Sequence, residues 1–202
     1  MALWRAAAPL VLASRSKARQ MLLAAAGVPI DVEPADLDER TLEAAAPAQK
    51  PATLAAYLAR EKASVIARRI PDRLVLGADQ VLGLGQERFV KPADRQAARA
   101  QLRALSGRTH ELYSAIAFVQ NTTVLFEHVG VARLTMRQLS DVFLESYLEA
   151  AGSAATTSVG GYQIEGVGIQ LFERVDGDYF TVLGLPLLPA LDFLRQRGCL
   201  MP

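Results

Sequence analysis

The 202-residue sequence is poor in cysteine and histidine and has no excess of either charge. Its one cysteine, Cys199, excludes an internal disulfide framework and a cysteine-based metal cage, and it favours a reducing compartment. Lysine and arginine number 22 against 21 aspartate and glutamate, so no global field draws the chain to nucleic acid or to a membrane surface. The two histidines, His110 and His128, lack the spacing of a metal-ligand pair, and we interpret both as structural. Any binding of phosphate must therefore come from a local cluster of side chains.

Long apolar runs are also missing. No stretch approaches the ~20 uncharged residues that cross a bilayer. Residues 5–13 imitate a short signal peptide, with Arg5 before an apolar run, but Pro9 interrupts that run and basic residues follow it directly. The run reads equally well as a first buried strand. We therefore predict a cytoplasmic protein with no membrane segment.

The apolar pattern predicts alternating strands and helices. Hydrophobic residues make up 51% of the chain and charged residues 21%, the balance of a globular protein that can build a packed core. We predict strands over residues 9–13, 27–32, 73–78, 109–120, 122–135, 169–175 and 179–183. We predict helices from about residue 15 to Gly27, over 51–69, 94–105 and 141–150, and up to Gly198. The fold class is therefore α/β with a mixed sheet, in one domain over residues 1–202. The Gly/Ser/Thr-rich segment 152–161 is a candidate mobile loop.

A first candidate site is the loop that follows the first strand. It places the hydroxyls of Ser14 and Ser16 and the three cations Arg15, Lys17 and Arg19 at a helix N-terminus. Unpaired backbone N–H groups and the helix dipole both favour an anion there, whereas basic residues oppose the dipole and call for an offsetting negative charge. The loop therefore indicates phosphate binding. The alternative is a capped, solvated first turn.

A second candidate is Asp79, which we predict at the C-terminal end of the strand over residues 73–78, with Gln80 beside it. Ligand crevices in α/β proteins form at that edge of the sheet, and a carboxylate there can activate water or hold a divalent cation. Taken alone, Asp79 is better explained as a helix cap or a turn residue. Lys62 and Lys91 are point charges that could neutralise a triphosphate, or ordinary solvated lysines. Glu165 is either a reader of a base edge or a surface turn residue.

Five segments of the sequence, taken together, resemble the Maf family of nucleoside triphosphate pyrophosphatases. They are LVLASRSKARQMLL at 10–23, LVLGADQVL at 74–82, KP at 91–92, LSGRTHELYSAIA at 105–117 and YQIEGVGIQLFERVDGDYFTVLGLPL at 162–187. The segments occur in the family's order and cover nearly the whole chain. The resemblance implies an elongated mixed sheet flanked by helices, with two lobes around a nucleotide cleft. It also implies hydrolysis between the α and β phosphates with a divalent cation, Mg²⁺ or Mn²⁺.

The resemblance also implies roles for single residues. Asp79 matches the family's proton acceptor, and Glu39 matches a carboxylate position that helps to hold the metal. Ser14, Ser16 and Arg19 match the hydroxyl and arginine positions of the family's phosphate-binding loop. Lys62 and Lys91 match its two lysines. Members of the family are often described as house-cleaning enzymes that remove modified nucleotides, and they often form homodimers.

The choice of substrate depends on Ala18, Gln80 and Glu165. The dTTP- and UTP-preferring branch tends to have threonine and glutamine where this chain has Gln80 and Glu165. Those two residues resemble the ones found in the branch that acts on 7-methyl-GTP. The tryptophan of that branch is replaced here by Ala18, and the proline that usually precedes this position in the family is replaced by Lys17. A glutamate can accept hydrogen bonds from N1–H and the N2 amino group of guanine, and charge-assisted bonds are strong. We therefore expect a guanine-type nucleotide, with a dTTP or UTP pyrophosphatase as the alternative.

Two other classes of protein are alternatives to an enzyme. A non-catalytic nucleotide-binding regulator is suggested by the link of some family members to arrest of cell division, and by the altered loop at Lys17 and Ala18. A nucleic-acid binder is disfavoured by the near-zero net charge and by the lack of a basic aromatic stripe. The expected partner is the nucleoside triphosphate itself.

Overall fold

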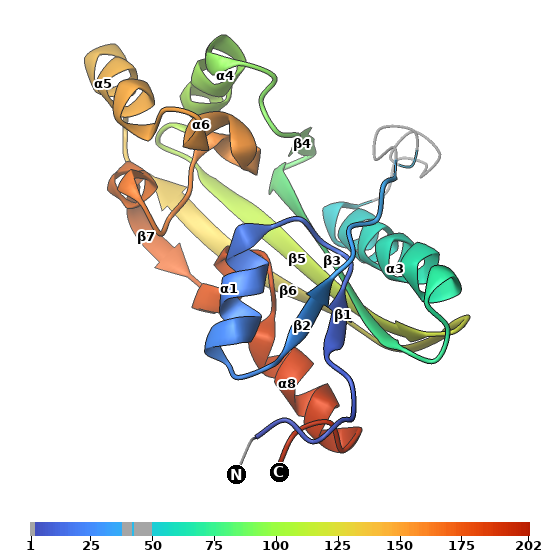
Figure 1. The fold of residues 1–202 in the computed structure, drawn as a ribbon. Helices are drawn as coiled ribbons and strands as arrows, with labels where there is room; N and C mark the ends of the chain where they lie inside the picture. The colour runs from blue at the N-terminus through green and yellow to red at the C-terminus, as the bar shows by residue number, and fades with distance from the viewer. Residues whose placement is uncertain (1–2, 38–41, 43–49) are drawn as a thin grey trace. The chain divides into compact units, whose positions relative to one another are not determined.

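The computed structural model describes residues 3–37, 42 and 50–202. Within these residues, seven strands form one sheet in the order β2-β1-β3-β5-β6-β7, with β4 paired to β3. The strands are β1 (Leu10–Leu12), β2 (Ile30–Val32), β3 (Leu74–Leu84), β4 (Glu87–Phe89), β5 (Thr109–Gln120), β6 (Thr123–Met136) and β7 (Phe172–Asp176). β1 pairs in parallel with β2 and β3, whereas β3 with β4 and β6 with β7 pair antiparallel. The predicted α/β class with a mixed sheet is confirmed (Figure 1).

Three of the described helices begin at a residue whose side chain caps the first turn. The described helices are α1 (Lys17–Ala25), α3 (Pro51–Arg69), α4 (Arg95–Leu105), α5 (Asp141–Ala151), α6 (Ala154–Thr157), α7 (Tyr179–Val182) and α8 (Leu187–Gln196), with 3₁₀ turns η1 (Val159–Gly161) and η2 (Val167–Leu171). Asp94 accepts from Ala97 N at 2.7 Å, and Ser140 accepts from Phe143 N at 3.2 Å, so each satisfies an otherwise unpaired N–H of the first turn. In the part of the chain that the structure describes, no helix has both the length and the apolar composition that a membrane crossing requires.

Contacts within the chain divide it into two compact units. The first unit comprises Met1–Gln80, Ser114–Gly130 and Tyr179–Pro202, and the second comprises Val81–Tyr113 and Val131–Asp178. Strands β3, β5 and β6 contribute residues to both units. The expectation of one domain over residues 1–202 stays a prediction.

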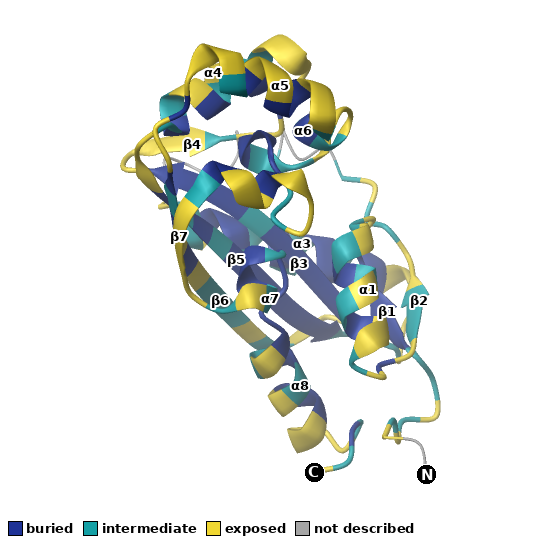
Figure 2. Ribbon diagram, turned by 90° about the vertical axis from the view of Figure 1, so that its left-hand side faces the viewer, coloured by how far each residue is buried: buried dark blue, intermediate teal, exposed yellow. Residues whose placement is uncertain are grey.

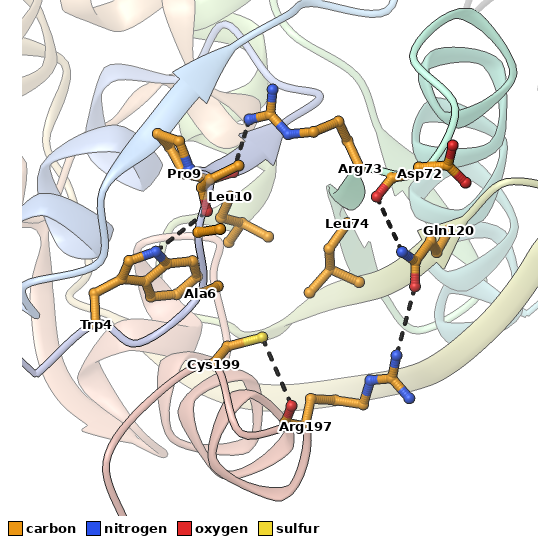
Figure 3. Close-up of a pocket in the computed structure, with 12 residues that line it drawn as sticks. Trp4, Ala6, Pro9, Leu10, Asp72, Arg73, Leu74, Gln120, Arg197 and Cys199 are labelled. Atoms are coloured by element: carbon orange, nitrogen blue, oxygen red, sulfur yellow. Dashed lines mark hydrogen bonds between the residues drawn. The ribbon is translucent and has the colours of Figure 1, made fainter.

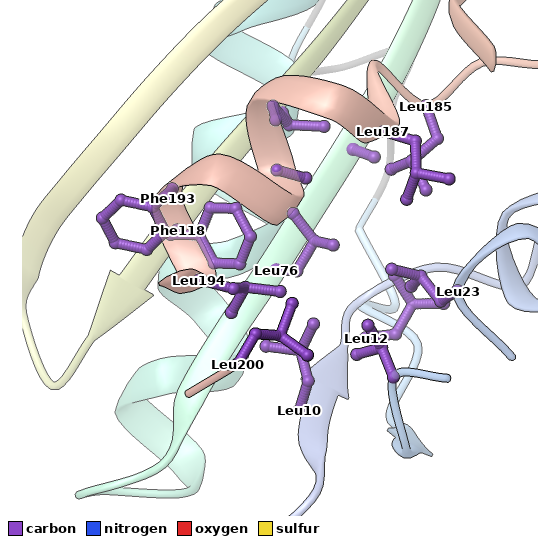
Figure 4. Packing of buried hydrophobic residues seen from close by; sticks show 14 residues of the cluster. Leu10, Leu12, Leu23, Leu76, Phe118, Leu185, Leu187, Phe193, Leu194 and Leu200 are labelled. Atoms are coloured by element: carbon purple, nitrogen blue, oxygen red, sulfur yellow. The ribbon is translucent and has the colours of Figure 1, made fainter. Parts of the chain in front are cut away.

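In the first unit, helices cover both faces of strands β1 and β3 (Figure 1). Successive side chains of a strand point to opposite faces. Val11 and Val75 pack with residues of α3, whereas Leu12 and Leu76 join a cluster that includes residues of α1 and α8. Figure 4 shows that second cluster, with Phe118 of β5 beside Phe193 of α8. Figure 2 shows the buried centre of β3 and the exposed outer sides of α1 and α8. This part of the sheet is therefore the middle layer of three.

In the second unit, α4 and α5 pack through apolar faces. The buried residues are Ala98, Leu102 and Leu105 of α4 and Leu144, Tyr147 and Leu148 of α5. The Tyr147 hydroxyl donates to Gly161 O at 3.0 Å. A side chain at Gly160 would approach Leu82 Cδ1 to 2.7 Å, and the φ of this glycine is +79°. The predicted mobile segment 152–161 thus forms α6 and η1, and its glycines fit a close turn.

Several of the predicted elements differ from the structure, and β2 begins only at Ile30 although a strand is predicted from residue 27. Residues 179–183 are predicted as a strand from their β-branched and aromatic content, but α7 is a helix whose last carbonyl groups bind side chains of β3 and β5. Residues 169–171 belong to η2, and β7 begins only at Phe172. β3 does not end at Ala78, because it continues to Leu84 and pairs with β4 and β5. Asn121, with a φ of 58°, lies between the neighbouring strands β5 and β6.

Candidate active site

Asp79 lies within β3, just beyond the point where the parallel strand β1 ends. The last paired residues are Leu12 and Leu76, and Ala13 N donates to Leu76 O at 2.9 Å. The position is therefore the carboxyl edge of the parallel strands, as predicted, although β3 itself continues. Because it is a buried strand residue, the interpretation of Asp79 as a helix cap or a turn residue is wrong.

Lys62 of α3 reaches the Asp79 carboxylate. Its Nζ lies 2.5 Å from Asp79 Oδ1, and each side chain is only 10% exposed. Taking two charges out of water is costly, so a buried pair of this kind requires close geometry. The structure thus joins two of the predicted site residues in one buried ion pair.

A glycine in β3 allows α3 to approach this closely. A Cβ added at Gly77 would lie 2.1 Å from Ala59 O and 2.9 Å from Ala63 Cβ, distances that real atoms do not tolerate. Ala59 and Ala63 lie on either side of Lys62 in α3, and Gly77 is two residues before Asp79 on the same face of the strand. The missing side chain therefore sets the separation of the ammonium from the carboxylate.

The loop between β1 and α1 brings together Ser14, Ser16 and Arg19. Ser16 is the N-cap of α1, and its Oγ accepts from Arg19 N at 3.4 Å. Ser14 is buried, and its Oγ accepts from Ser16 N at 3.3 Å and from Arg19 Nη1 at 3.0 Å. Arg15 is paired with Asp36 at the surface, while Lys17 is exposed. The loop has the hydroxyls and helix N-terminus that the phosphate-binding prediction requires.

Arg19 is held by the main chain around it. Its Nε donates to Gly184 O and its Nη1 to Ala78 O, both at 2.8 Å. Ala78 immediately precedes Asp79 in β3. Arg19 thus connects the start of α1 with the strand that carries the carboxylate, and a direct bond from Arg19 to phosphate stays a prediction.

The remaining predicted residues lie apart in the sequence and differ in exposure. Ala18 is half-buried in the first turn of α1, and the Gln80 amide nitrogen donates to Ser114 Oγ at 2.9 Å. Lys91 and Glu165 are exposed residues of the second unit, and their part in a common site with Asp79 stays a prediction.

Ser114 is a polar residue of this region that sequence reasoning missed. It is fully buried in β5, on the same face of the strand as the core residues Ile116 and Phe118. A hydroxyl on the same face of the strand as the buried residues Leu112, Ile116 and Phe118 is the signal that could have drawn attention to it. Its donors and acceptors come from distant parts of the chain, and the local sequence does not reveal them.

The histidines agree with a structural interpretation. His110 is fully buried in the second unit, where its Nε2 lies 2.7 Å from the Tyr162 hydroxyl. Burial lowers the pKa of His110 to about 4, so the ring is neutral at pH 7. His128 stacks on Phe126 with an interplanar angle of 1°.

The predicted metal-holding carboxylates are Asp79 and Glu39, and Glu39 lies outside the described residues. Among residues 3–37, 42 and 50–202, no three His, Cys, Asp or Glu side chains gather closely enough to hold a metal ion. Mg²⁺ is usually held by one or two carboxylates together with phosphate oxygens. Asp79 therefore fits a cation that enters with a triphosphate better than a cage built by these residues alone.

A pocket of about 260 Å³ lies at the other end of the same strands (Figure 3). Leu10 at the start of β1 and Leu74 at the start of β3 line it, together with Trp4 and Arg197. Arg73 closes one side by donating to Pro9 O at 2.8 Å. None of the predicted site residues lines this pocket, so it is separate from the Lys62–Asp79 pair.

Comparison with known proteins gives a consistent result over the whole chain. The family model described as "Maf-like protein" matches residues 9–197. A nucleoside triphosphate pyrophosphatase of Rhodopseudomonas palustris (strain BisB18) is 56% identical over 200 residues, covering 99% of both chains. A protein of the same name from Bradyrhizobium diazoefficiens is 55% identical and covers 98% of both. A 7-methyl-GTP pyrophosphatase of Rhizobium etli is 50% identical over 94% of this chain and 96% of its own. The chain belongs to the Maf-like family.

Proposed function

We propose that this protein hydrolyses a nucleoside triphosphate to the nucleoside monophosphate and pyrophosphate. The observation that carries the proposal is the buried ion pair of Lys62 with Asp79 at the carboxyl edge of β1. Membership of the Maf-like family and the names of the similar proteins support it. The ammonium orients the carboxylate at the edge of the sheet where α/β proteins bind ligands, and a carboxylate placed there can act as a general base toward water.

In the proposed reaction, water attacks the α-phosphorus while Asp79 accepts its proton. A bond forms between the water oxygen and the α-phosphorus, and the bond from that phosphorus to the bridging oxygen breaks. Pyrophosphate leaves with the electron pair, and the proton passes from Asp79 to solvent. Lys62 orients the carboxylate, because its Nζ lies 2.5 Å from Asp79 Oδ1. A divalent cation, when bound by Asp79 and Glu39, would neutralise negative charge on the phosphates.

The loop of Ser14 and Ser16 would hold the triphosphate. Their hydroxyls and the N-terminus of α1 provide donors for phosphate oxygens. Arg19 orients this loop through Ser14 Oγ at 3.0 Å and adds positive charge to it. Lys91 would neutralise a further phosphate oxygen. Reactions of this type depend chiefly on positioning and charge stabilisation, which these side chains supply.

We infer that the substrate is a guanine-type nucleotide such as 7-methyl-GTP. Glu165 would accept from the N–H groups of guanine, whereas the carbonyl-rich edge of uracil would be repelled. The name of the Rhizobium etli relative supports this choice, while the other names specify no base. Ala18 and Gln80 are the other positions on which specificity would depend, and a dTTP or UTP pyrophosphatase is the alternative.

The function is tested by assaying a panel of nucleoside triphosphates for release of pyrophosphate with Mg²⁺ or Mn²⁺. The proposal expects pyrophosphate and a nucleoside monophosphate in equal amounts, with 7-methyl-GTP among the best substrates. Preference for dTTP and UTP would overturn the interpretation of Gln80 and Glu165. Tight nucleotide binding without turnover would instead support a regulator.

We also propose that the protein works in the cytoplasm as a homodimer. The single cysteine, Cys199, supports a reducing compartment, and family resemblance supports the dimer. Light scattering of the purified protein would give a mass near twice 21.8 kDa. A mass of one chain at assay concentration would exclude the dimer as the working form.

A further inference from the structure

The short helix α7 ends against strands β3 and β5, whose side chains donate to its last carbonyl groups. The carbonyl groups at the end of a helix lack partners within the helix. Gln80 Nε2 lies 3.0 Å from Val182 O and 3.3 Å from Thr181 O, and Ser114 Oγ lies 2.7 Å from Thr181 O. These two side chains provide donors from outside the helix and so fix the end of α7 in the first unit.

The hydroxyl of Ser114 acts with the carbonyl groups of Thr181 and Val182 to orient the Gln80 amide. A carbonyl oxygen only accepts, so the single hydroxyl hydrogen of Ser114 is donated to Thr181 O. The lone pairs of Ser114 Oγ then face Gln80 at 2.9 Å, where they select the amide nitrogen over the amide oxygen. Because Ser114 is fully buried, water cannot easily replace either bond. Gln80 Oε1 is consequently turned away from the end of α7.

The same segment is attached to the strand on the other side of Asp79. Arg19 donates to Gly184 O and to Ala78 O, both at 2.8 Å. Residues 181–184 are thereby held to Ala78 and to Gln80, the two neighbours of Asp79 in β3. The Gln80 and Asp79 side chains point to opposite faces of the strand, because successive residues alternate. The contacts of Ser114 thus act on β3 from the face opposite Lys62.

We propose that Ser114 is a positioning residue of the active site. Through Gln80 and residues 181–184 it fixes the stretch of β3 that presents Asp79 to the substrate. The inference rests on the proposed function, since it concerns how Asp79 is aligned for turnover.

The test compares kcat and KM of wild-type protein and Ser114→Ala with the best nucleotide of the panel, below the melting temperature of both. We expect kcat to fall about tenfold, because small displacements of reacting groups slow catalysis steeply. We expect KM to change by less than about twofold, because the serines of the phosphate loop are left in place. Ser140→Ala is the matched control. It removes the N-cap bond of α5 at 3.2 Å in the second unit, so it should lower the melting temperature and leave kcat unchanged.

A double-mutant cycle separates positioning from general loss of stability. If Ser114 acts through Gln80, the variant Ser114→Ala with Gln80→Ala is no slower than the slower single variant. Single effects that multiply in the double variant would overturn the inference. Ser114→Cys keeps a weak donor of similar size and should retain an intermediate kcat. It replaces Ser114→Ala, under the same criteria, if the alanine variant does not fold.

The two proposals fail in different ways. An active wild-type protein whose kcat is unchanged in Ser114→Ala refutes the positioning role alone. A folded wild-type protein that releases no pyrophosphate from any nucleotide of the panel refutes the proposed function.

Discussion

Replacing Lys62 by methionine tests whether the buried ion pair is a main determinant of the site. Methionine keeps much of the length and apolar volume of lysine but removes the ammonium from the Asp79 carboxylate. Both side chains are only 10% exposed, so water compensates poorly for the lost charge. We expect Lys62→Met to lower both the stability and the turnover of the protein.

The expected loss of stability is large for a single substitution. Removing one member of a buried pair costs roughly 3–5 kcal/mol, because the other charge stays in a poorly solvated place. For a chain of about this length, 1 kcal/mol corresponds to roughly 2–4 °C in melting temperature. The melting temperature of Lys62→Met should therefore fall by roughly 10 °C.

A control in the same chain is the exposed pair of Arg103 and Asp141. Arg103 Nη2 lies 2.5 Å from Asp141 Oδ1, the same separation as in the buried pair, but the side chains are 48% and 65% exposed. Exposed pairs contribute about 0–1 kcal/mol, so Arg103→Met should change the free energy of unfolding little. Urea denaturation of both variants at pH 7 gives the comparison. Equal losses in the two variants would refute our account of the buried pair.

The double variant Lys62→Met with Asp79→Asn provides a second check. It removes both charges, so it should recover much of the stability that Lys62→Met loses. It should not recover turnover, because the proton acceptor is gone. A double variant less stable than Lys62→Met would contradict the electrostatic origin of the loss.

Three further predictions concern the packing and the pH dependence of the fold. Gly77→Ala should lower the free energy of unfolding by more than about 2 kcal/mol and lower turnover, because the added Cβ would lie 2.1 Å from Ala59 O. The control is Gly27→Ala, whose Cβ would enter open space. Its φ of +73° should cost only about 1 kcal/mol in urea denaturation. Phe118→Ala should cost roughly 3–5 kcal/mol in urea denaturation, since the ring is fully buried 4.6 Å from that of Phe193; a loss below about 1 kcal/mol would contradict the packing. The pKa of His110 falls from 6.5 to about 4 on folding, so the unfolded chain takes up a proton at a higher pH than the folded chain does. The free energy of unfolding should therefore fall by roughly 3 kcal/mol through this histidine as the pH is lowered from about 6.5 to about 4. Urea denaturation of His110→Phe at several pH values should lack that part of the pH dependence.

Local sequence signals predicted the longer helices of this protein, although α6 and α7 were not predicted as helices. Ser16, Asp94 and Ser140 cap α1, α4 and α5 close to the predicted helix starts, because the preference of these residues for a helix start is a short-range effect. Residues 179–183 show the limit of such signals. Their β-branched and aromatic content favours a strand, but Gln80 and Ser114, far away in the sequence, bind the carbonyl groups of a helix end.

In the candidate site, too, the residue types were predictable from the sequence but their contacts were not. The sequence identified Asp79 and Lys62 separately, but their ion pair depends on the approach of α3 to β3 at Gly77, which is a tertiary contact. Arg19 was predicted as a phosphate ligand, whereas its bonds to Ala78 O and Gly184 O are visible only in the folded chain. Chemically active residue types can thus be read from the sequence, while their partners require the fold.

The central claim is that water attacks the α-phosphorus with Asp79 as the proton acceptor. Hydrolysis of the best nucleotide in ¹⁸O-labelled water, followed by mass spectrometry of both products, tests it most directly. The account predicts one ¹⁸O atom in the nucleoside monophosphate and none in pyrophosphate, with almost no label incorporated by the folded variant Asp79→Asn. Label in pyrophosphate, or wild-type incorporation by Asp79→Asn, would contradict the claim.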